Sequence, residues 1–441
     1  MKTDRRKPGW LLRFIAIVAF VVLAAPATLS NDTTVVERFG LIRTQGNKIV
    51  DKDGNPVVLR GMSLFWSQWM PQFYNFDCVR WLRDDWKCTV VRAAMGIESG
   101  GYLTNPTIEK ARVKAVIDAC IALGIYVIVD WHDHNAQNHR AEAIGFFQEI
   151  ASQYGTSPNL IYEIYNEPQQ VSWTGVVKPY ADSVVQCIRA IDPDNLIIVG
   201  TPTWSQDVDV ASLTPLSYSN VAYALHFYAA THKQALRNKA ATALNRGVAL
   251  FVTEFGTCES SGTGILDSVE VDTWMKFMSD NQLSWCNWSI ADKSETSAAL
   301  IPGASGSGGW PASALTRSGS MIRDIIRTGN ELLLSAVTLR TESPDRFALF
   351  QNYPNPFNPT TEIQYIIPVG TRPRQGSRGK HAVSLQIYDL LGREVATLVN
   401  EKKEPGRYSV WWSPNNLSGG VYLSRLMADE FIQTRKMIFL K

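Results

Sequence analysis

Residues 160–168, Leu-Ile-Tyr-Glu-Ile-Tyr-Asn-Glu-Pro, decide the fold of this chain and carry its most informative side chain. The run is apolar and strand-favouring, and Pro168 ends it because proline has no backbone N–H to donate to a sheet. Glu167 is therefore predicted at the carboxyl end of a buried strand. A second run, Leu-Phe-Val-Thr-Glu-Phe-Gly at 250–256, ends in the same way with Glu254. The rest of the chain determines whether these two carboxylates meet.

Short apolar runs alternate with helical patterns from about residue 36 to 330. Apolar runs without polar alternation are typical of parallel strands that are buried on both faces. One helix between them is well marked, with Asn105 as its N-cap, Pro106 in the first position and Gly124 closing it. Eight strand–helix units predict an α/β fold, a (β/α)8 TIM barrel. The predicted strands are Val57–Leu64, Cys88–Ala93, Ile125–Trp131, Leu160–Asn166, Asn195–Gly200, Val221–Tyr228, Val248–Phe255 and Ser284–Ser289.

Strand parity indicates which side chains look into the barrel, because alternate residues of a strand share a face. Glu163, Tyr165 and Glu167 share one face, but Glu163 lies roughly 13 Å below Glu167 along the strand. We interpret Glu163 as an interior carboxylate, paired with Arg92. The carboxyl ends of barrel strands carry the active site. The residues predicted around that mouth are Glu167, His226, Tyr228, Glu254 and Trp288, with Arg92 and His132 ending two further strands.

Two carboxylates at one mouth are what hydrolysis of a glycosidic bond requires. We assign Glu167 as the acid/base that protonates the leaving oxygen and Glu254 as the nucleophile of a retaining reaction. A hydrogen bond from Tyr228 is expected to hold Glu254 ionised, and Arg92 is expected to lower its pKa.

The remaining polar and aromatic residues of the mouth receive supporting roles. Asn166 is expected to bind the 2-hydroxyl of the sugar, and Trp288 to stack beneath the ring. His132 and His226 are expected to tune proton transfer or to hold substrate hydroxyls. Taken singly, each residue also has a plainer interpretation. A glutamate at a strand end is usually a solvated rim residue, and a histidine in a strand is usually a hydrogen-bonded core residue.

Composition and charge narrow the possible classes of protein. The chain has 441 residues, 45% of them hydrophobic and 19% charged, as in ordinary globular proteins. Residues 28–345 hold 25 basic and 33 acidic side chains, and a net charge of −8 argues against a nucleic-acid partner. The sequence has neither a nucleotide loop nor a zinc spacing, so we expect no cofactor and no metal. We predict four buried free thiols: Cys88, Cys120, Cys187 and Cys286.

The two ends of the chain differ from its body. Residues 1–27 combine a basic start, a short apolar run and Ala25-Pro26-Ala27, which predicts a cleaved signal peptide; the alternative is an uncleaved anchor. Residues 331–345 are predicted to be a linker after the catalytic domain at 36–330. Residues 346–441 are predicted to form a small all-β, sandwich-like domain. Its predicted strands are Glu362–Ile367, Val383–Tyr388, Arg407–Trp412, Val421–Met427 and Phe431–Ile438.

The first domain resembles glycoside hydrolase family 5, in particular the bacterial endo-β-1,4-glucanases (cellulases) of its subfamily 2. The resemblance spans about residues 36–328 and is carried by GNPVVLRGMS, VVRAAM, YVIVDWH, IYEIYNEP, VGTPTWSQDV, YALHFYAATH, FVTEFGT, LSWCNWS and DKSETSAAL. It implies retaining hydrolysis of internal β-1,4-glucosidic bonds in cellulose or related glucans. It places the family's active-site residues at Arg92, His132, Asn166, Glu167, His226, Tyr228, Glu254 and Trp288.

The same resemblance implies binding of sugars on the non-reducing side by Trp69, Trp204, Lys293 and Glu295. Many relatives have Ser-Thr-His where this chain has Ser63-Leu64-Phe65, so a histidine contact is replaced and Phe65 is expected to stack on the substrate. Two alternatives stay open. One is a hydrolase of the same family that acts on mannan, xyloglucan or mixed-linkage glucan, and the other is a non-catalytic glycan-binding surface protein.

The C-terminal region resembles the sorting domain of proteins exported by bacterial type IX secretion. The segments FQNYPNPFNPTTEI, IYDLLGREVATLV, GGVYLSRL and TRKMIFLK carry this resemblance. It implies that the secretion machinery is a partner and that the protein is secreted or attached to the cell surface. The alternative is a carbohydrate-binding module with Trp411 and Trp412 as its platform, which strand parity disfavours because adjacent residues face opposite ways. We expect a monomer with a polysaccharide as its substrate.

Overall fold

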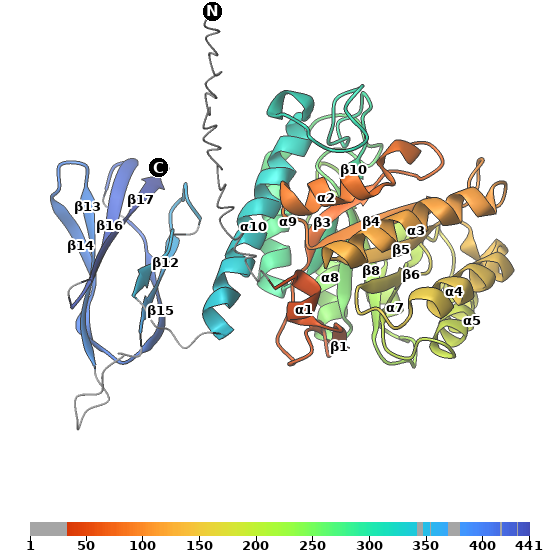
Figure 1. The fold of residues 1–441 in the computed structure, drawn as a ribbon, viewed down its shortest axis with the longest axis horizontal. Coiled ribbons are helices and arrows are strands. Elements are labelled where there is room, and N and C mark those ends of the chain that lie inside the picture. Colours follow the sequence, from red (N-terminus) through yellow and green to blue (C-terminus); the bar gives the residue numbers. More distant parts are fainter. Residues whose placement is uncertain (1–32, 342–346, 353, 369–379, 415–416, 430) are drawn as a thin grey trace, which may run out of the picture.

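The computed structural model describes residues 33–341, 347–352, 354–368, 380–414, 417–429 and 431–441 (Figure 1). Its first domain is a closed barrel of parallel strands in the order β10-β3-β4-β5-β6-β7-β8-β9, which confirms the predicted TIM barrel. The strands are β3 (Arg60–Leu64), β4 (Val90–Gly96), β5 (Tyr126–His132), β6 (Leu160–Glu163), β7 (Leu196–Val199), β8 (Val221–Tyr228), β9 (Leu250–Gly256) and β10 (Ser284–Ile290).

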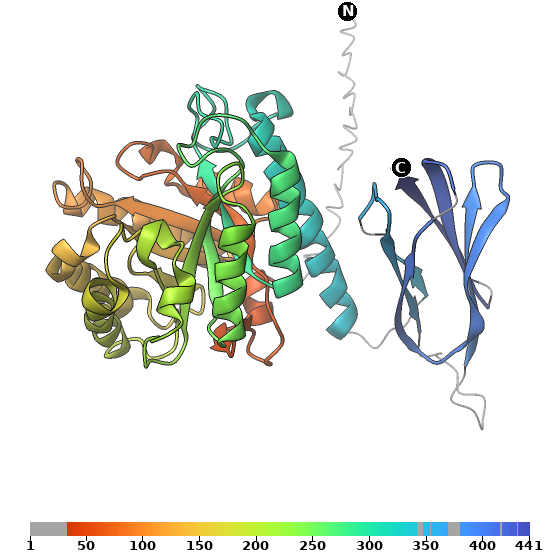
Figure 2. The same cartoon turned by 180° about the vertical axis from the view of Figure 1, so that it is seen from behind.

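Helices surround the barrel and bury the outer face of its strands (Figures 1 and 2). In β8 and α9, for example, the rings of Phe227 and Trp274 stack with centroids 3.9 Å apart. Every residue of β4, β5, β9 and β10 is buried, because side chains face either the barrel interior or the helices. The α-helices of this layer are α2 (Phe76–Asp84), α3 (Pro106–Leu123), α4 (Arg140–Tyr154), α5 (Lys178–Arg189), α6 (Pro202–Ser205), α7 (Val208–Ala211), α8 (Gln234–Asn245), α9 (Ser268–Asn281) and α10 (Arg317–Thr341).

Local signals set where these helices begin and end. Helix α3 starts with Pro106 and closes at Gly124 in the left-handed conformation (φ 66°), as predicted. The Asn105 side chain donates to the carbonyl of Gly100 and does not cap the helix. Short single-turn elements lie between the main helices: η1 (Pro71–Phe73), η2 (Ala136–Asn138), η3 (Trp173–Val177) and η4 (Ala312–Ala314).

The chain before the barrel covers its amino-terminal end. Helix α1 (Val35–Phe39) is followed by the antiparallel pair β1 (Arg43–Gln45) and β2 (Lys48–Val50). The backbone N–H of Val36 donates to the carbonyl of Gly124, and the hydroxyl of Tyr126 donates to the carbonyl of Gly40. The opposite end of the barrel therefore stays open for a site.

One prediction from strand parity is wrong. Strand β6 ends at Glu163 rather than at Asn166, so the alternation of faces does not continue to Glu167. Tyr165 turns outward, donates a hydrogen bond to Gln137 and packs its ring against Tyr180 of α5. Glu163 and Glu167 both face the barrel axis, as predicted, because the irregular backbone after β6 brings Glu167 back to the inner side.

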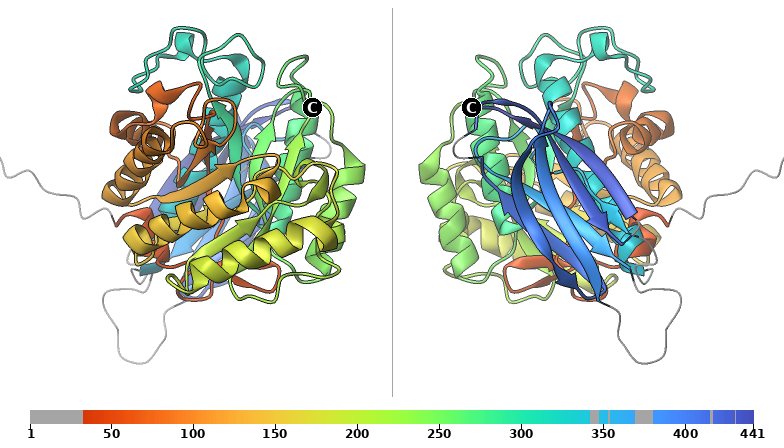
Figure 3. Two further views of the ribbon diagram at one scale, coloured as in Figure 1. Left: turned by 90° about the vertical axis from the view of Figure 1, so that its right-hand side faces the viewer. Right: turned by 90° about the vertical axis from the view of Figure 1, so that its left-hand side faces the viewer.

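The C-terminal domain consists of two antiparallel sheets that enclose an apolar core, as predicted (Figure 3). Trp412 lies in that core, whereas the neighbouring Trp411 is 64% exposed, so the two rings do not form one platform. Strand β14 was not predicted. One sheet contains β11 (Ala348–Leu349), β12 (Thr361–Ile367) and β15 (Gly406–Trp412), and the other contains β14 (Glu394–Lys403), β13 (His381–Asp389), β16 (Gly420–Ala428) and β17 (Phe431–Phe439).

The predicted linker begins too early. Helix α10 extends to Thr341, so the first residues of 331–345 are helical, and residues 342–345 lie outside the described part of the chain. The predicted signal peptide at 1–27 also lies outside it. Among the described residues, none of the helices combines the length and apolar character needed to cross a bilayer.

All six cysteines lie in the described part and are free thiols. Cys88, Cys120 and Cys286 are buried, as predicted, whereas Cys187 is only partly buried. Burial raises the pKa of the Cys187 thiol to about 11, so this group is also protonated at neutral pH.

Candidate active site

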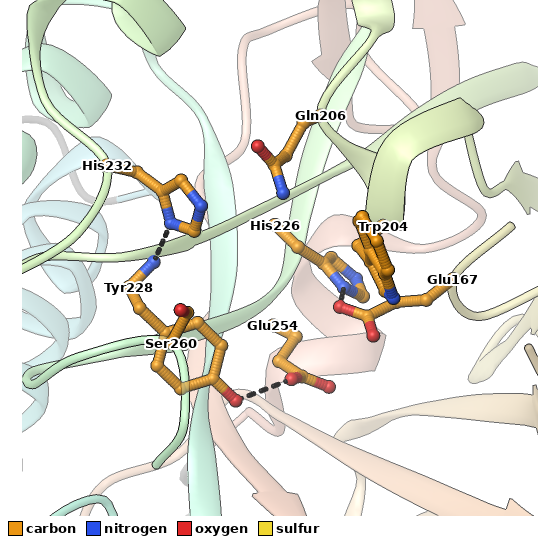
Figure 4. Close-up of a pocket in the computed structure, with 8 residues that line it drawn as sticks. All are labelled: Glu167, Trp204, Gln206, His226, Tyr228, His232, Glu254 and Ser260. Carbon is orange, nitrogen blue, oxygen red and sulfur yellow. Dashed lines mark hydrogen bonds and ion pairs between the residues drawn. The ribbon is translucent and has the colours of Figure 1, made fainter. Parts of the chain in front are cut away.

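A cavity of about 350 Å³ opens at the carboxyl ends of the barrel strands. Glu167, which follows β6, and Glu254 of β9 face each other across it (Figure 4). One oxygen of each carboxylate and one nitrogen of His226 all lie within 4.8 Å of one another. The two predicted carboxylates therefore meet. The residues that line the cavity are Glu167, Trp204, Gln206, His226, Tyr228, His232, Glu254 and Ser260.

Arg92 of β4 is fully buried beneath the cavity and organises its floor. Its Nε donates to Glu163 (2.7 Å), which confirms the predicted pair, and its Nη1 donates to Glu254 (3.1 Å). Its Nη2 lies 2.6 Å from Asn166 Oδ1 and 2.9 Å from Asp130 Oδ2. A planar guanidinium can serve all of these acceptors at once, which an ammonium group could not do.

Loss of Arg92 is expected to destabilise the protein strongly. Arg92→Met should lower the free energy of unfolding by about 3–5 kcal/mol, because Asp130 and Glu163 would be left as buried carboxylates without their cation. Arg80→Ala is the matched control, since its pair with Asp77 is about half exposed and should contribute less than about 1 kcal/mol. Urea unfolding of both variants measures the difference. Equal losses in the two variants would contradict the assigned role.

Glu254 receives a hydrogen bond from the Tyr228 hydroxyl (2.9 Å), as predicted. Burial and the negative charge of Glu167 nevertheless raise its pKa, against the opposing effects of His226, Arg92 and Tyr228. Arg92 lowers the pKa of Glu254, as expected, but burial and Glu167 outweigh it and the net shift is upward. Moving a proton onto Glu167 removes one of the two main causes, so ionisation of Glu254 is linked to protonation of Glu167.

Glu167 lies between two histidines. His226 Nδ1 is 2.9 Å from one carboxylate oxygen, and His134 Nε2 is 3.3 Å from the other. Burial raises the pKa of Glu167, but the hydrogen bonds from His134 and His226 outweigh it and lower the pKa to about 2. Burial lowers the pKa of His226, but the nearby carboxylates of Glu163 and Glu167 outweigh it and raise the pKa to about 9. The resting site thus places a proton on His226 beside an ionised Glu167.

His134 was not among the predicted residues, and its ring centroid lies 6.4 Å from that of His132. His132 Nδ1 is 2.6 Å from Asp130 Oδ2, and burial lowers the pKa of His132 well below its usual value. Its ring lies parallel to that of Trp288 with centroids 5.2 Å apart. His132 thus lies in one network with Asp130 and Trp288, and His134 contacts Glu167 directly.

Four of the predicted sugar-binding residues form one cluster around Phe65. Its ring centroid is 5.2 Å from that of Trp288 and 6.3 Å from that of Trp69, and Lys293 Nζ lies 4.5 Å above it. Lys293 also pairs with Glu295 (2.5 Å). Exposure differs across the cluster, since Trp69 is 53% exposed and Trp288 is nearly buried. The cluster therefore presents an aromatic surface with one cation and one carboxylate beside it.

Trp204 stands apart from this cluster, in the cavity beside Glu167. Thr203, Trp204 and Ser205 all have left-handed backbones, with φ between 54° and 58°. Hydrogen bonds hold this turn: the Trp204 N–H donates to the carbonyl of Pro168, and the Ser205 hydroxyl donates to that of Asn166. The turn that positions Trp204 is thereby fastened to the segment that carries Glu167.

Asn166, which directly precedes Glu167, is fully buried. Its Oδ1 accepts from Arg92, and its Nδ2 has no hydrogen-bond partner within the described chain. A buried amide donor without a partner is costly unless a ligand uses it. The geometry fits the predicted contact with a substrate hydroxyl.

Two groups of side chains among the described residues have donor atoms spaced closely enough to hold a cation. One is Glu167, His226 and Glu254, and the other is Glu98, Asp133 and His139 at the rim. Asp133 already accepts from the Trp131 indole (3.2 Å) and contacts His139 Nδ1 (2.8 Å). Hydrogen bonds and ion pairs among the described side chains account for the close spacing in both groups, so the spacing is not evidence for a bound cation.

Comparisons with known proteins agree with this fold and geometry. The family described as "Cellulase (glycosyl hydrolase family 5)" matches residues 50–294, and "Secretion system C-terminal sorting domain" matches residues 351–440. Endoglucanase Z of Dickeya dadantii is 47% identical over 77% of this chain and 78% of its own length. The first domain therefore belongs to glycosyl hydrolase family 5.

Solved structures show the same relationship. A structure from Cytophaga hutchinsonii has 53% identity and a TM-score of 0.68, and the alignment covers 69% of this chain and 99% of that one. A variant of the Thermobifida fusca endoglucanase Cel5A catalytic domain, solved with cellotetraose, has 36% identity and a TM-score of 0.64, with coverage of 67% and 99%. The protein is an endoglucanase of this family, and its sorting domain marks it for export.

Proposed function

We propose that this chain is a secreted endo-β-1,4-glucanase that cleaves internal bonds of cellulose or related glucans by retaining double displacement. The observation that carries the mechanism is the approach of Glu167 and Glu254 to within 4.8 Å. Retaining enzymes hold their carboxyl groups about 5–5.5 Å apart, whereas inverting enzymes leave about 6.5–9.5 Å for a water molecule. The substrate class is supported by the endoglucanase relatives and by the cellotetraose bound to one of them.

The first step forms a covalent glycosyl-enzyme. A Glu254 oxygen attacks the anomeric carbon while Glu167 passes the proton that it shares with His226 to the glycosidic oxygen, and the leaving chain departs with a free hydroxyl. Glu254 is held for this attack by Tyr228 and Arg92. In the second step Glu167 takes a proton from water, which displaces Glu254 from the anomeric carbon. Two inversions at that carbon give net retention.

The substrate-binding residues divide between the two sides of the carboxylate pair. We place Trp204 on the leaving-group side, because it stands beside Glu167, the acid that protonates the leaving oxygen. This revises the expectation that Trp204 binds the non-reducing side. We place Phe65, Trp69, Lys293 and Glu295 with Trp288 on the non-reducing side, where one ring surface and two charged groups bind successive sugars.

A substrate panel tests the choice of polymer. The purified protein should release reducing ends fastest from carboxymethyl cellulose and should convert cellopentaose to shorter oligosaccharides. Faster release from mannan, xyloglucan or lichenan would favour the same-family alternative. Release from none of these polymers would favour the non-catalytic glycan-binding alternative, against which the intact carboxylate pair argues.

Truncation of Trp69 is expected to weaken substrate binding with little effect on the chemical step. The Trp69→Ala variant should raise KM for cellopentaose by about 5- to 10-fold, the equivalent of about 1–1.5 kcal/mol of lost ring contact, while kcat stays near that of the wild type. Trp411→Ala is the matched control, because its ring is similarly exposed (64%) but lies in the sorting domain. A rise in KM for Trp411→Ala alone would instead make the C-terminal domain the glycan binder.

A further inference from the structure

A chain of hydrogen bonds runs behind the acid/base, away from the cavity. His226 Nδ1 faces Glu167, and its other nitrogen, Nε2, lies 2.8 Å from the hydroxyl of Thr253. That hydroxyl lies 2.6 Å from Glu163 Oε1, and Glu163 Oε2 accepts from Arg92. Thr253 and Glu163 are fully buried, and His226 is 2% exposed. Thr253 has no role in the mechanism described above.

The direction of each hydrogen bond in this chain is determined. Burial raises the pKa of Glu163, but its contacts with Arg92 and His226 lower it below the usual value, so Glu163 is ionised and can only accept. The hydroxyl of Thr253 has a single proton and must donate it to Glu163. Its oxygen therefore accepts from His226 Nε2, which must carry a proton. The tautomer of His226 follows from residues that never touch the substrate.

We propose that Thr253, held by Glu163, fixes His226 in the tautomer protonated at Nε2 and thereby keeps an acidic proton between His226 and Glu167. This inference rests on the proposed role of Glu167 as the acid/base. With Nε2 always protonated, the Nδ1 position can only share a proton with Glu167. If that proton is lost, the Nδ1 lone pair and the carboxylate of Glu167 are two acceptors 2.9 Å apart. Because this deprotonated state is unfavourable, the proton stays between His226 and Glu167 to higher pH.

The carboxylates around His226 act in the same direction. Glu167 and Glu163 lie 2.9 and 3.8 Å from its nitrogens, and Glu254 adds a third negative charge. Arg92, His132 and His134, together with Asp130, belong to the surrounding network. The three carboxylates favour a proton on His226 and the positive charge of Arg92 opposes it, but none of these charges selects the nitrogen that carries the proton. That selection comes from Thr253.

Paired substitutions at Thr253 separate the hydroxyl from the shape of the side chain. Thr253→Val keeps the shape and removes the hydroxyl, and Thr253→Ser keeps the hydroxyl. In Thr253→Val, neutral His226 can move its proton to Nδ1 and donate to ionised Glu167, so the inactive, deprotonated state becomes accessible. The alkaline limb of the kcat/KM–pH profile should move to lower pH by about one unit or more. Thr253→Ser should keep the wild-type limb.

A loss of kcat/KM that is equal at all pH values in Thr253→Val would overturn the proposal, because it would indicate packing alone. Nitrogen-15 NMR of histidine-labelled wild-type protein gives a second test that does not depend on how a variant folds. The chain has six histidines, and His226 is assigned from the signal that is lost in His226→Gln. A proton on Nε2 across the titration supports the proposal, and a neutral Nδ1–H form overturns it. The NMR measurement reads the tautomer of His226 whether or not Glu167 is the acid/base. If Glu167→Gln stays active, the proposed function fails, and the NMR result still decides the tautomer.

Discussion

Replacement of Glu254 by glutamine is expected to abolish turnover while the fold is kept. The change removes the nucleophile, and kcat on cellopentaose should fall by about 10⁴-fold or more. The melting temperature should stay near that of the wild type. Burial and Glu167 already raise the pKa of Glu254, so the folded protein loses little when this carboxylate becomes a neutral amide, and Arg92 keeps its ion pairs with Glu163 and Asp130. Reducing-end assays and thermal unfolding measure the two effects.

Glu254→Ala with azide gives a stricter form of the same test. The space left by the side chain should admit azide, which attacks the anomeric carbon of an aryl β-cellobioside from the face that Glu254 normally uses. The product should be the α-glycosyl azide, with the aryl alcohol released. A β-glycosyl azide from this variant, or activity of Glu254→Gln close to that of the wild type, would contradict the assignment of the nucleophile.

Replacement of Glu167 by glutamine is expected to give a loss that depends on the leaving group. On cellopentaose, whose leaving oxygen needs a proton, kcat/KM should fall by about 10²- to 10⁴-fold. On dinitrophenyl β-cellobioside, whose leaving group departs without a proton, kcat/KM should stay within about tenfold of the wild-type value. Steady-state kinetics with both substrates measure the difference.

Glu163→Gln is the control for Glu167→Gln, because Glu163 is also an interior carboxylate near His226 but lies behind it. At acidic pH, where His226 keeps its proton whichever tautomer its neutral form prefers, the losses of Glu163→Gln should be similar on the two substrates, since Glu163 does not itself protonate the leaving oxygen. If kcat/KM of Glu167→Gln falls equally on both substrates, Glu167 is not the acid that protonates the leaving oxygen.

The sequence was sufficient for the fold because each barrel strand is short, apolar and buried on both faces. Parity then placed His226 and Tyr228 of β8 on the inner face together, where the structure has them. Parity failed for Tyr165 because β6 ends at Glu163, and nothing in a local apolar run marks where pairing stops. The prediction that Glu167 lies at the carboxyl end of the barrel was still correct, because this residue lies at that end whether the strand stops at Glu163 or at Asn166.

The residues that the sequence did not reveal act through partners that are distant along the chain. Asp130 is recognisable only once Arg92 is known to reach it, and Thr253 only once His226 and Glu163 are known to flank it. The net direction of the pKa shift of Glu254 needed the same information, because burial and Glu167 outweigh Arg92. In the C-terminal domain, the half-buried strand β14 lacks the strong apolar pattern that marks a core strand.

The stereochemistry of the first products tests the central claim most directly. Proton NMR of cellopentaose hydrolysis by the wild-type protein can follow the anomeric signals before mutarotation mixes them. The geometry of Glu167 and Glu254 predicts that the β-anomer of the new reducing end appears first and the α-anomer later. Initial formation of the α-anomer, or no cleavage of cellopentaose, would contradict the account.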